Sequence, residues 1–195
     1  PQLQVLRLHS GITIDHTWNV HSLALAIKNH RNLKEISIRN FVIQCQDVKE
    51  TREAFADDAD ADVPLFLLDP LILAASSIET LECLDLSCIV AHRPKHQPFL
   101  RPGALQILLE SCSNLRKLGL AKLGLLDEHL RVLTESLLVL DGSSSTSLMS
   151  EVAWNDNPFS ESTFCECVLP VVQRNRTVQV LKVYNHSRLS SETCQ

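Results

Sequence analysis

Three short motifs carry residue types that can bind metal ions. In the first, Asp58-Ala-Asp-Ala-Asp62 places carboxylates at alternate positions, as at the start of a calcium-binding loop, and Asp69 falls at the twelfth position. Val63 occupies the position where the sharp turn of such a loop needs glycine, and Pro64 follows it. We therefore interpret this stretch as a solvated acidic loop.

The other two motifs contain histidines and cysteines. His92 and His96 have the spacing of metal ligands, but they stand among prolines and cationic residues. Such a composition is typical of a stiff loop between a strand and a helix. Cys165 and Cys167 are expected on a helix with their thiols about 200° apart. This separation disfavours a shared metal, so the sequence predicts no metal site.

No set of residues typical of an enzyme can be assembled. No spacing in the sequence marks a catalytic set of serine, histidine and acid or a pair of carboxylates in a pocket. A glycine-rich phosphate-binding turn is missing as well. We therefore predict a protein without catalytic activity, cofactor or small-molecule substrate. The missing glycine-rich turn also disfavours a doubly wound α/β domain.

Charge and composition limit the kinds of partner. The 195-residue chain has a net charge of −5, and the segment Gln46–Pro64 supplies all of it, with seven acidic residues against Lys49 and Arg52. A nucleic-acid-binding protein would carry a basic stripe and stacking aromatic residues. The apolar stretches are far shorter than the roughly 20 residues of a membrane span. We expect binding neither to nucleic acid nor to membranes.

The cysteines bear on the cellular compartment. Seven cysteines are an odd number in a chain too large to need disulfides, and none forms a CxxC pair. We expect reduced thiols and a cytoplasmic protein. The glycosylation triplets at Asn175 and Asn185 would fit secretion, but two of them are close to the number expected by chance.

A repeated apolar pattern is the most informative feature. The motif Leu-x-x-Leu-x-Leu, or a variant of it, defines six units that start at Leu3, Leu33, Leu81, Leu115, Met149 and Val178. The intervals are 30, 48, 34, 34 and 29 residues, and the longest contains an acidic insert at residues 46–64. Alternating apolar residues predict a short strand in each unit. The leucines expected inside are Leu6, Leu8, Leu84, Leu86, Leu118 and Leu120.

Helical patterns separate these strands. Apolar residues recur at i, i+3, i+4 and i+7 in three sets: Leu23, Ala26, Ile27, His30; Leu105, Leu108, Leu109, Cys112; and Phe164, Cys167, Val168, Val171. A fourth helical stripe consists of Leu126, Leu130, Leu133 and Leu137. His30 and Cys112 end two of these stripes, and we interpret both as buried packing residues. No strand–helix unit can bury its own apolar face, so stacking around a parallel sheet with right-handed crossovers is expected.

The pattern resembles the leucine-rich repeat family. Intervals near 30 residues are similar to its ribonuclease-inhibitor-like subclass, and residues 108–120 match best. The resemblance covers nearly the whole chain and implies one α/β domain over residues 1–195. That domain would be a horseshoe-shaped solenoid with a parallel sheet on its concave face and helices on its convex face.

The chain departs from the family at the turn position, where an asparagine usually follows each strand. The six turn positions hold Gly11, Phe41, Ile89, Leu123, Asn157 and His186. Backbone groups that an asparagine would bond need other partners, so we expect irregular turns and a loose register in the second and third units. We expect the acidic insert to be mobile, because its charges cannot enter a core. Neither end carries a polar cap, so we expect a fragment of a longer repeat protein.

The outward face of the strands is the predicted binding surface. Strand alternation places on it Arg7, His9, Glu35, Arg39, Asp85, Lys117, Glu151, Asn155, Lys182 and Tyr184. Solenoids bind through this face, and arginine and tyrosine are common anchors, so we predict a scaffold that binds another protein. Two alternatives are the ligand-sensing region of an innate-immune-type receptor and a leucine-rich-repeat GTPase-activating protein. The second would need an exposed arginine such as Arg39.

Overall fold

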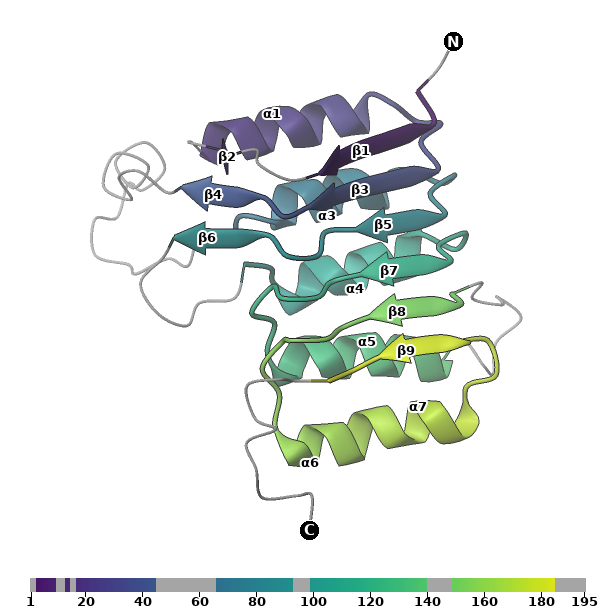
Figure 1. Cartoon of the computed structure of the whole chain (residues 1–195). Coiled ribbons are helices and arrows are strands. Elements are labelled where there is room, and N and C mark those ends of the chain that lie inside the picture. The colour runs from purple at the N-terminus through teal and green to yellow at the C-terminus, as the bar shows by residue number, and fades with distance from the viewer. Residues whose placement is uncertain are drawn as a thin grey trace.

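The chain alternates strands and helices in an α/β arrangement. The computed structural model describes residues 3–9, 13–14, 17–44, 66–92, 99–139 and 149–184. Its main sheet has six strands, all parallel, and neighbours in the sheet are also successive in this series: β1 (Val5–His9), β3 (Glu35–Arg39), β5 (Cys83–Asp85), β7 (Lys117–Gly119), β8 (Glu151–Ala153) and β9 (Val180–Lys182). Each unit therefore pairs directly with the next one (Figure 1).

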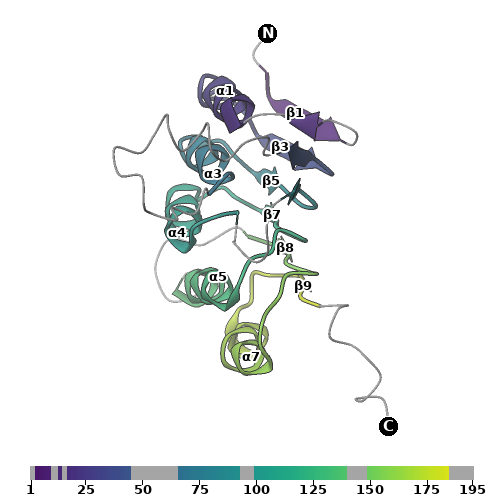
Figure 2. The same cartoon turned by 90° about the vertical axis from the view of Figure 1, so that its left-hand side faces the viewer.

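Helices connect the strands and lie on one side of this sheet (Figure 2). They are α1 (Thr17–Lys28), α3 (Asp69–Ser76), α4 (Pro102–Ser111), α5 (Asp127–Val139), and a last segment made of α6 (Glu161–Thr163), a π-helical turn (Phe164–Val168) and α7 (Leu169–Arg174). Each packs on the next in chain order. The opposite face of the sheet has no helix of the described chain against it.

The leucines predicted to face inward do so. Leu84, Leu86, Leu118 and Leu120 are at most 1% exposed, and burying each side chain stabilises the fold by roughly 2 kcal/mol. Leu6 and Leu8 also pack against the core, but they are only half-buried because β1 is an edge strand. The alternation of strand residues was therefore predicted correctly.

The helix stripe of α4 is confirmed, whereas the stripes of α1 and α5 hold only in part. Leu126 stands one residue before α5 and is exposed, so its predicted burial is wrong, while Leu130, Leu133 and Leu137 are buried. Leu105, Leu108, Leu109 and Cys112 are all buried. In α1, however, Ala26 and His30 are exposed, so their predicted burial is wrong. Val20 and Ala24 cover the core instead. The helix ends at Lys28, and α1 stands at the end of the row with a helix neighbour on one side only.

The four turns that the structure describes, at Phe41, Ile89, Leu123 and Asn157, are regular, so the expectation of irregular turns is wrong for these units. Asn40, Cys88, Lys122 and Asp156 each precede a turn position, and their φ angles lie together at 56°, 62°, 58° and 62°. Backbone hydrogen bonds continue through these turns, from Cys88 N to the oxygen of Ala121 at 2.8 Å and from Lys122 N to that of Asn155 at 3.0 Å. The second and third units share one register with the fourth.

A second sheet, which the sequence did not predict, follows these turns in the first three units. It consists of β2 (Thr13–Ile14), β4 (Val42–Gln44) and β6 (Val90–His92), again parallel and in chain order. Its strands pair directly after the turn positions, so the backbone there bonds between neighbouring units without an asparagine side chain. Phe41 and Ile89 can therefore fill the turn positions as buried apolar side chains.

Beyond the last strand of the second sheet, β6, the Asn157 side chain bonds the backbone of the turns. It is fully buried, and its Oδ1 accepts hydrogen bonds from the backbone N–H groups of Leu123 and Leu125, at 2.8 and 3.2 Å. Its Nδ2 donates to the carbonyl oxygens of Leu120 and Trp154, at 2.7 and 3.0 Å. One amide side chain thus joins the turns of two successive units.

Some predicted features lie outside the described residues: the acidic insert at residues 46–64, His96, the turn positions Gly11 and His186, and the glycosylation triplet at Asn185. Asp69 is described and begins α3, where its buried carboxylate accepts hydrogen bonds from the backbone and side chain of Arg101. Within the described ranges, none of the helices combines the length and the apolar character needed to cross a bilayer.

Candidate binding face

Rows of side chains cross the open face of the main sheet. Because the strands pair in register, residues that oppose one another stand in line across the sheet. The first row contains Val5, Glu35, Cys83, Lys117, Glu151 and Val180, and the second contains Arg7, Ser37, Asp85, Gly119, Ala153 and Lys182. A third row begins with His9 opposite Arg39.

These rows surround a hollow of about 780 Å³. The predicted binding residues line it, with the exception of His9, whose Nε2 lies 2.8 Å from the hydroxyl of Ser37. Small residues line the middle of the hollow, namely Gly119, Ala121 and Ala153. The alternation of strand residues therefore brought the predicted set together on one face.

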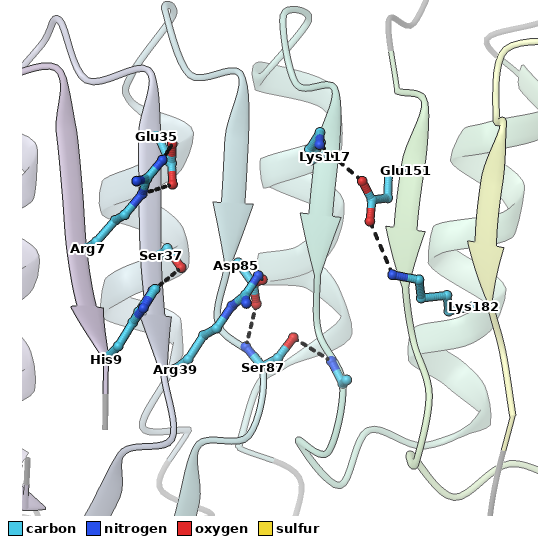
Figure 3. A network of polar contacts seen from close by, with 11 residues as sticks. Arg7, His9, Glu35, Ser37, Arg39, Asp85, Ser87, Lys117, Glu151 and Lys182 are labelled. Carbon is cyan, nitrogen blue, oxygen red and sulfur yellow. Dashed lines mark hydrogen bonds and ion pairs between the residues drawn. The ribbon is translucent and has the colours of Figure 1, made fainter. Parts of the chain in front are cut away.

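At the β1 edge, Arg7 and Glu35 form a two-pronged ion pair (Figure 3). The guanidinium donates to both carboxylate oxygens, at 2.5 and 2.7 Å. The hydrogen bond from Arg7 lowers the pKa of the Glu35 carboxyl below its usual value, and the same contact raises the pKa of Arg7. Both groups are therefore charged at neutral pH.

Arg39 reaches from β3 to Asp85 on β5 and forms the second pair. Asp85 also accepts a hydrogen bond from the backbone N–H of Ser87 at 3.0 Å, and the Ser87 hydroxyl accepts one from Ala121 N at 3.2 Å. Asp85 lies above Gly119, where a Cβ atom would overlap its carboxylate. The arginine that a GTPase-activating role would require is thus half-exposed and engaged by a carboxylate.

The third cluster lies at the β9 edge, where Glu151 stands between two lysines. Its carboxylate oxygens lie 3.2 Å from Lys117 Nζ and 3.3 Å from Lys182 Nζ. These two ammonium groups lower the pKa of the Glu151 carboxyl, first through the contact with Lys117. Figure 3 shows this cluster on β7, β8 and β9 and the Arg39 pair on β3 and β5.

Sequence reasoning missed some of the residues that line the hollow. Glu82 and Arg116 each stand one position before a strand, so strand alternation assigned them to the opposite face. Asn40 and Cys88 line it from the left-handed turns. Cys83, in contrast, was placed on this face by strand alternation and lies in the first row; burial raises the pKa of its thiol, so it is protonated at neutral pH. No sequence pattern marks a residue at a strand entrance or in a turn as part of the face.

Other singled-out residues lie elsewhere. Cys165 is exposed whereas Cys167 is buried, which agrees with thiols that point in different directions. His92 belongs to β6, so the prediction of a loop there is wrong at this residue. Asn175, the acceptor of one glycosylation triplet, is buried, and its Nδ2 donates to the carbonyl oxygen of Leu137 at 2.7 Å.

No protein-family model matches this chain, and no curated protein matches it either. The candidate function therefore follows from the residues and their geometry.

Proposed function

We propose that this chain is a leucine-rich repeat protein of the ribonuclease-inhibitor-like kind that binds another protein through its strand face, without catalysis. The repeated strand–helix unit, the common left-handed turn and the bridging asparagine at position 157 support this proposal. The fold is then a solenoid whose open sheet lies on the concave side. A cytoplasmic location belongs to the proposal, since the five cysteines among the described residues are not in disulfides.

One observation carries the functional part: the hollow is lined by polar side chains that are already held in place. Three sets of ion pairs fix them across neighbouring strands, and strands are rigid supports. A surface ordered in advance loses little side-chain entropy when a partner binds. Preorganisation of this kind favours binding through the strand face.

The dimensions favour a protein segment as the partner. Six strands at about 4.8 Å spacing and three exposed residues deep span roughly 24 by 10 Å. Such an area of about 240 Å² is far below the roughly 800 Å² per partner of a standard interface between domains. Small-molecule sites are mostly apolar and enclose their ligand, whereas this face is charged. A short segment of a partner, supported by further contacts at the rim, fits best.

The test places a photo-cross-linking amino acid at one of two positions in the full chain. Ala153 lies in the middle of the hollow, and Gln106 is an exposed residue of α4 on the helix side. We expect a cross-link to a defined protein from Ala153 and none to that protein from Gln106. Cross-links from Gln106 alone, or none from Ala153, would show that the strand face is not the binding surface.

A further inference from the structure

The three ion-pair clusters share an asymmetry: the cation is always the more exposed partner. The side chains of Arg7, Arg39, Lys117 and Lys182 are 60%, 51%, 59% and 50% exposed, whereas those of Glu35, Asp85 and Glu151 are 23%, 12% and 31% exposed. The carboxylates therefore lie low on the sheet and the cations lie above them. A molecule approaching this face meets guanidinium and ammonium groups first.

The charge of the hollow differs in sign from that of the chain. Its lining contains five cations, Arg7, Arg39, Arg116, Lys117 and Lys182, and four acids, Glu35, Glu82, Asp85 and Glu151, which gives a balance of +1. The whole chain carries −5. The strand face is thus a local positive site on an acidic protein, and complementary potentials determine which partners associate.

Each cation keeps unused N–H donors after it has paired with the carboxylate beneath it. A guanidinium has five N–H donors and an ammonium has three, and each carboxylate contact uses only part of that set. In the structure Arg39 meets Asp85 through one nitrogen, Nη2. Acidic groups from outside can therefore join these pairs as additional acceptors without breaking them.

We propose that the partner presents an acidic segment to this face, with its Asp or Glu carboxylates bound by Arg39 at one end and by Lys117 and Lys182 at the other. This inference rests on the proposed function and states the chemistry of the partner. Four strand spacings separate β3 from β9, or about 19 Å. An extended segment of about six residues spans that distance at roughly 3.3 Å per residue. It passes over the small residues Gly119 and Ala153, which leave room for its backbone.

An acidic peptide suits the face better than a nucleic acid. Single-stranded nucleic acids are held by a basic groove with aromatic side chains on which the bases stack. Among the described residues that line the hollow, the aromatic contribution is Tyr184 alone. Carboxylates in the lining would repel a continuous row of phosphates, whereas spaced acidic side chains can reach the cations between them.

The experiment measures binding of a fluorescein-labelled oligoglutamate peptide to the full chain by fluorescence anisotropy. We expect saturable binding that weakens as salt rises and no binding of an uncharged oligoglutamine peptide of the same length. The double variant Arg39→Gln, Lys182→Gln should bind about fivefold more weakly, because two exposed charge contacts are lost.

The matched control is Arg131→Gln. Arg131 is 47% exposed and pairs with Glu166 at 3.2 Å on the helix side, so its removal should leave the affinity unchanged. Circular dichroism checks that each variant is folded, and the single variant Lys182→Gln replaces the double variant if the latter is not.

Three results would overturn the inference: no binding of oligoglutamate, equal affinity of the double variant and the original chain, or equally tight binding of inorganic polyphosphate with the same dependence on both residues. The last would make the face a general polyanion site. If oligoglutamate fails while the cross-link from Ala153 persists, the chain binds a protein of different chemistry, and the proposed function stands without this inference.

Discussion

Replacing Asn157 with leucine tests how the turns of successive units are joined. The side chain is fully buried and makes four hydrogen bonds to backbone groups, two as acceptor and two as donor. Leucine has a similar volume and already occupies the turn position at Leu123. The substitution therefore removes the hydrogen bonds while it leaves the packing volume nearly unchanged.

The expected magnitude follows from the groups that lose their partners. The backbone N–H groups of Leu123 and Leu125 would be left without their acceptor, at a cost of about 2 kcal/mol each. The carbonyl oxygens of Leu120 and Trp154 would each lose a donor, which adds a smaller cost. Burial of the leucine side chain offsets about 2 kcal/mol of this loss. We expect Asn157→Leu to lower the free energy of unfolding by about 2–3 kcal/mol.

Urea unfolding, followed by circular dichroism and by tryptophan emission, measures this change. Trp154 is fully buried and should report the transition. The matched control is Ile89→Leu at the equivalent turn position of the third unit, where the second sheet begins at β6 and bonds the backbone. A swap between aliphatic residues of equal size should cost less than about 1.5 kcal/mol. Equal effects of the two substitutions would refute the bridging role of Asn157.

Two further predictions concern the strand face. Gly119→Ala should destabilise the chain by about 1–2 kcal/mol, because the added Cβ overlaps the carboxylate of Asp85, which is held by the backbone of Ser87. In a double-mutant cycle measured by urea unfolding, this cost should vanish in the Asp85→Ala background. A cost that persisted there would show that the strain does not come from Asp85. Glu151→Gln should cost roughly 1 kcal/mol at neutral pH. Since the folded pKa of Glu151 lies below its ordinary value of 4.5, its contribution is present above pH 4.5 and is lost as the pH falls through the folded pKa. The stability difference between the original chain and Glu151→Gln, measured by urea unfolding across this range, should therefore disappear in acid, and a difference that stayed constant would exclude ionisation as its source.

Strand alternation was enough to predict most of the candidate site. Glu35, Lys117 and Lys182 belong to strands whose inward neighbours are apolar, and this pattern is visible within five residues of chain. A pleated strand must put alternate side chains on opposite faces. Placing the strands in parallel and in chain order then brings the outward residues together.

The partners of those residues could not be predicted in the same way. Arg39 and Asp85 are 46 residues apart, with the acidic insert between them, and their contact depends on the register of β3 against β5. A shift of one residue would move every side chain to the other face. Which carboxylate lies beneath which cation is therefore decided by pairing between strands.

The second sheet and the regular turns could not be predicted from local sequence patterns either. The sequence at Phe41 and Ile89 lacks the usual asparagine, and from this we expected irregular turns. Directly after these positions β2, β4 and β6 pair with one another, and this pairing forms only when the units are stacked.

The sequence by itself determined the strand–helix order, the inward leucines and the outward set of charged residues, because these depend on periodicities within one unit. The tertiary structure alone decided the ion pairs, the regular turns and the greater exposure of the cations over the carboxylates. These features depend on backbone hydrogen bonds and packing between units 28 or more residues apart, and no local pattern encodes such distances.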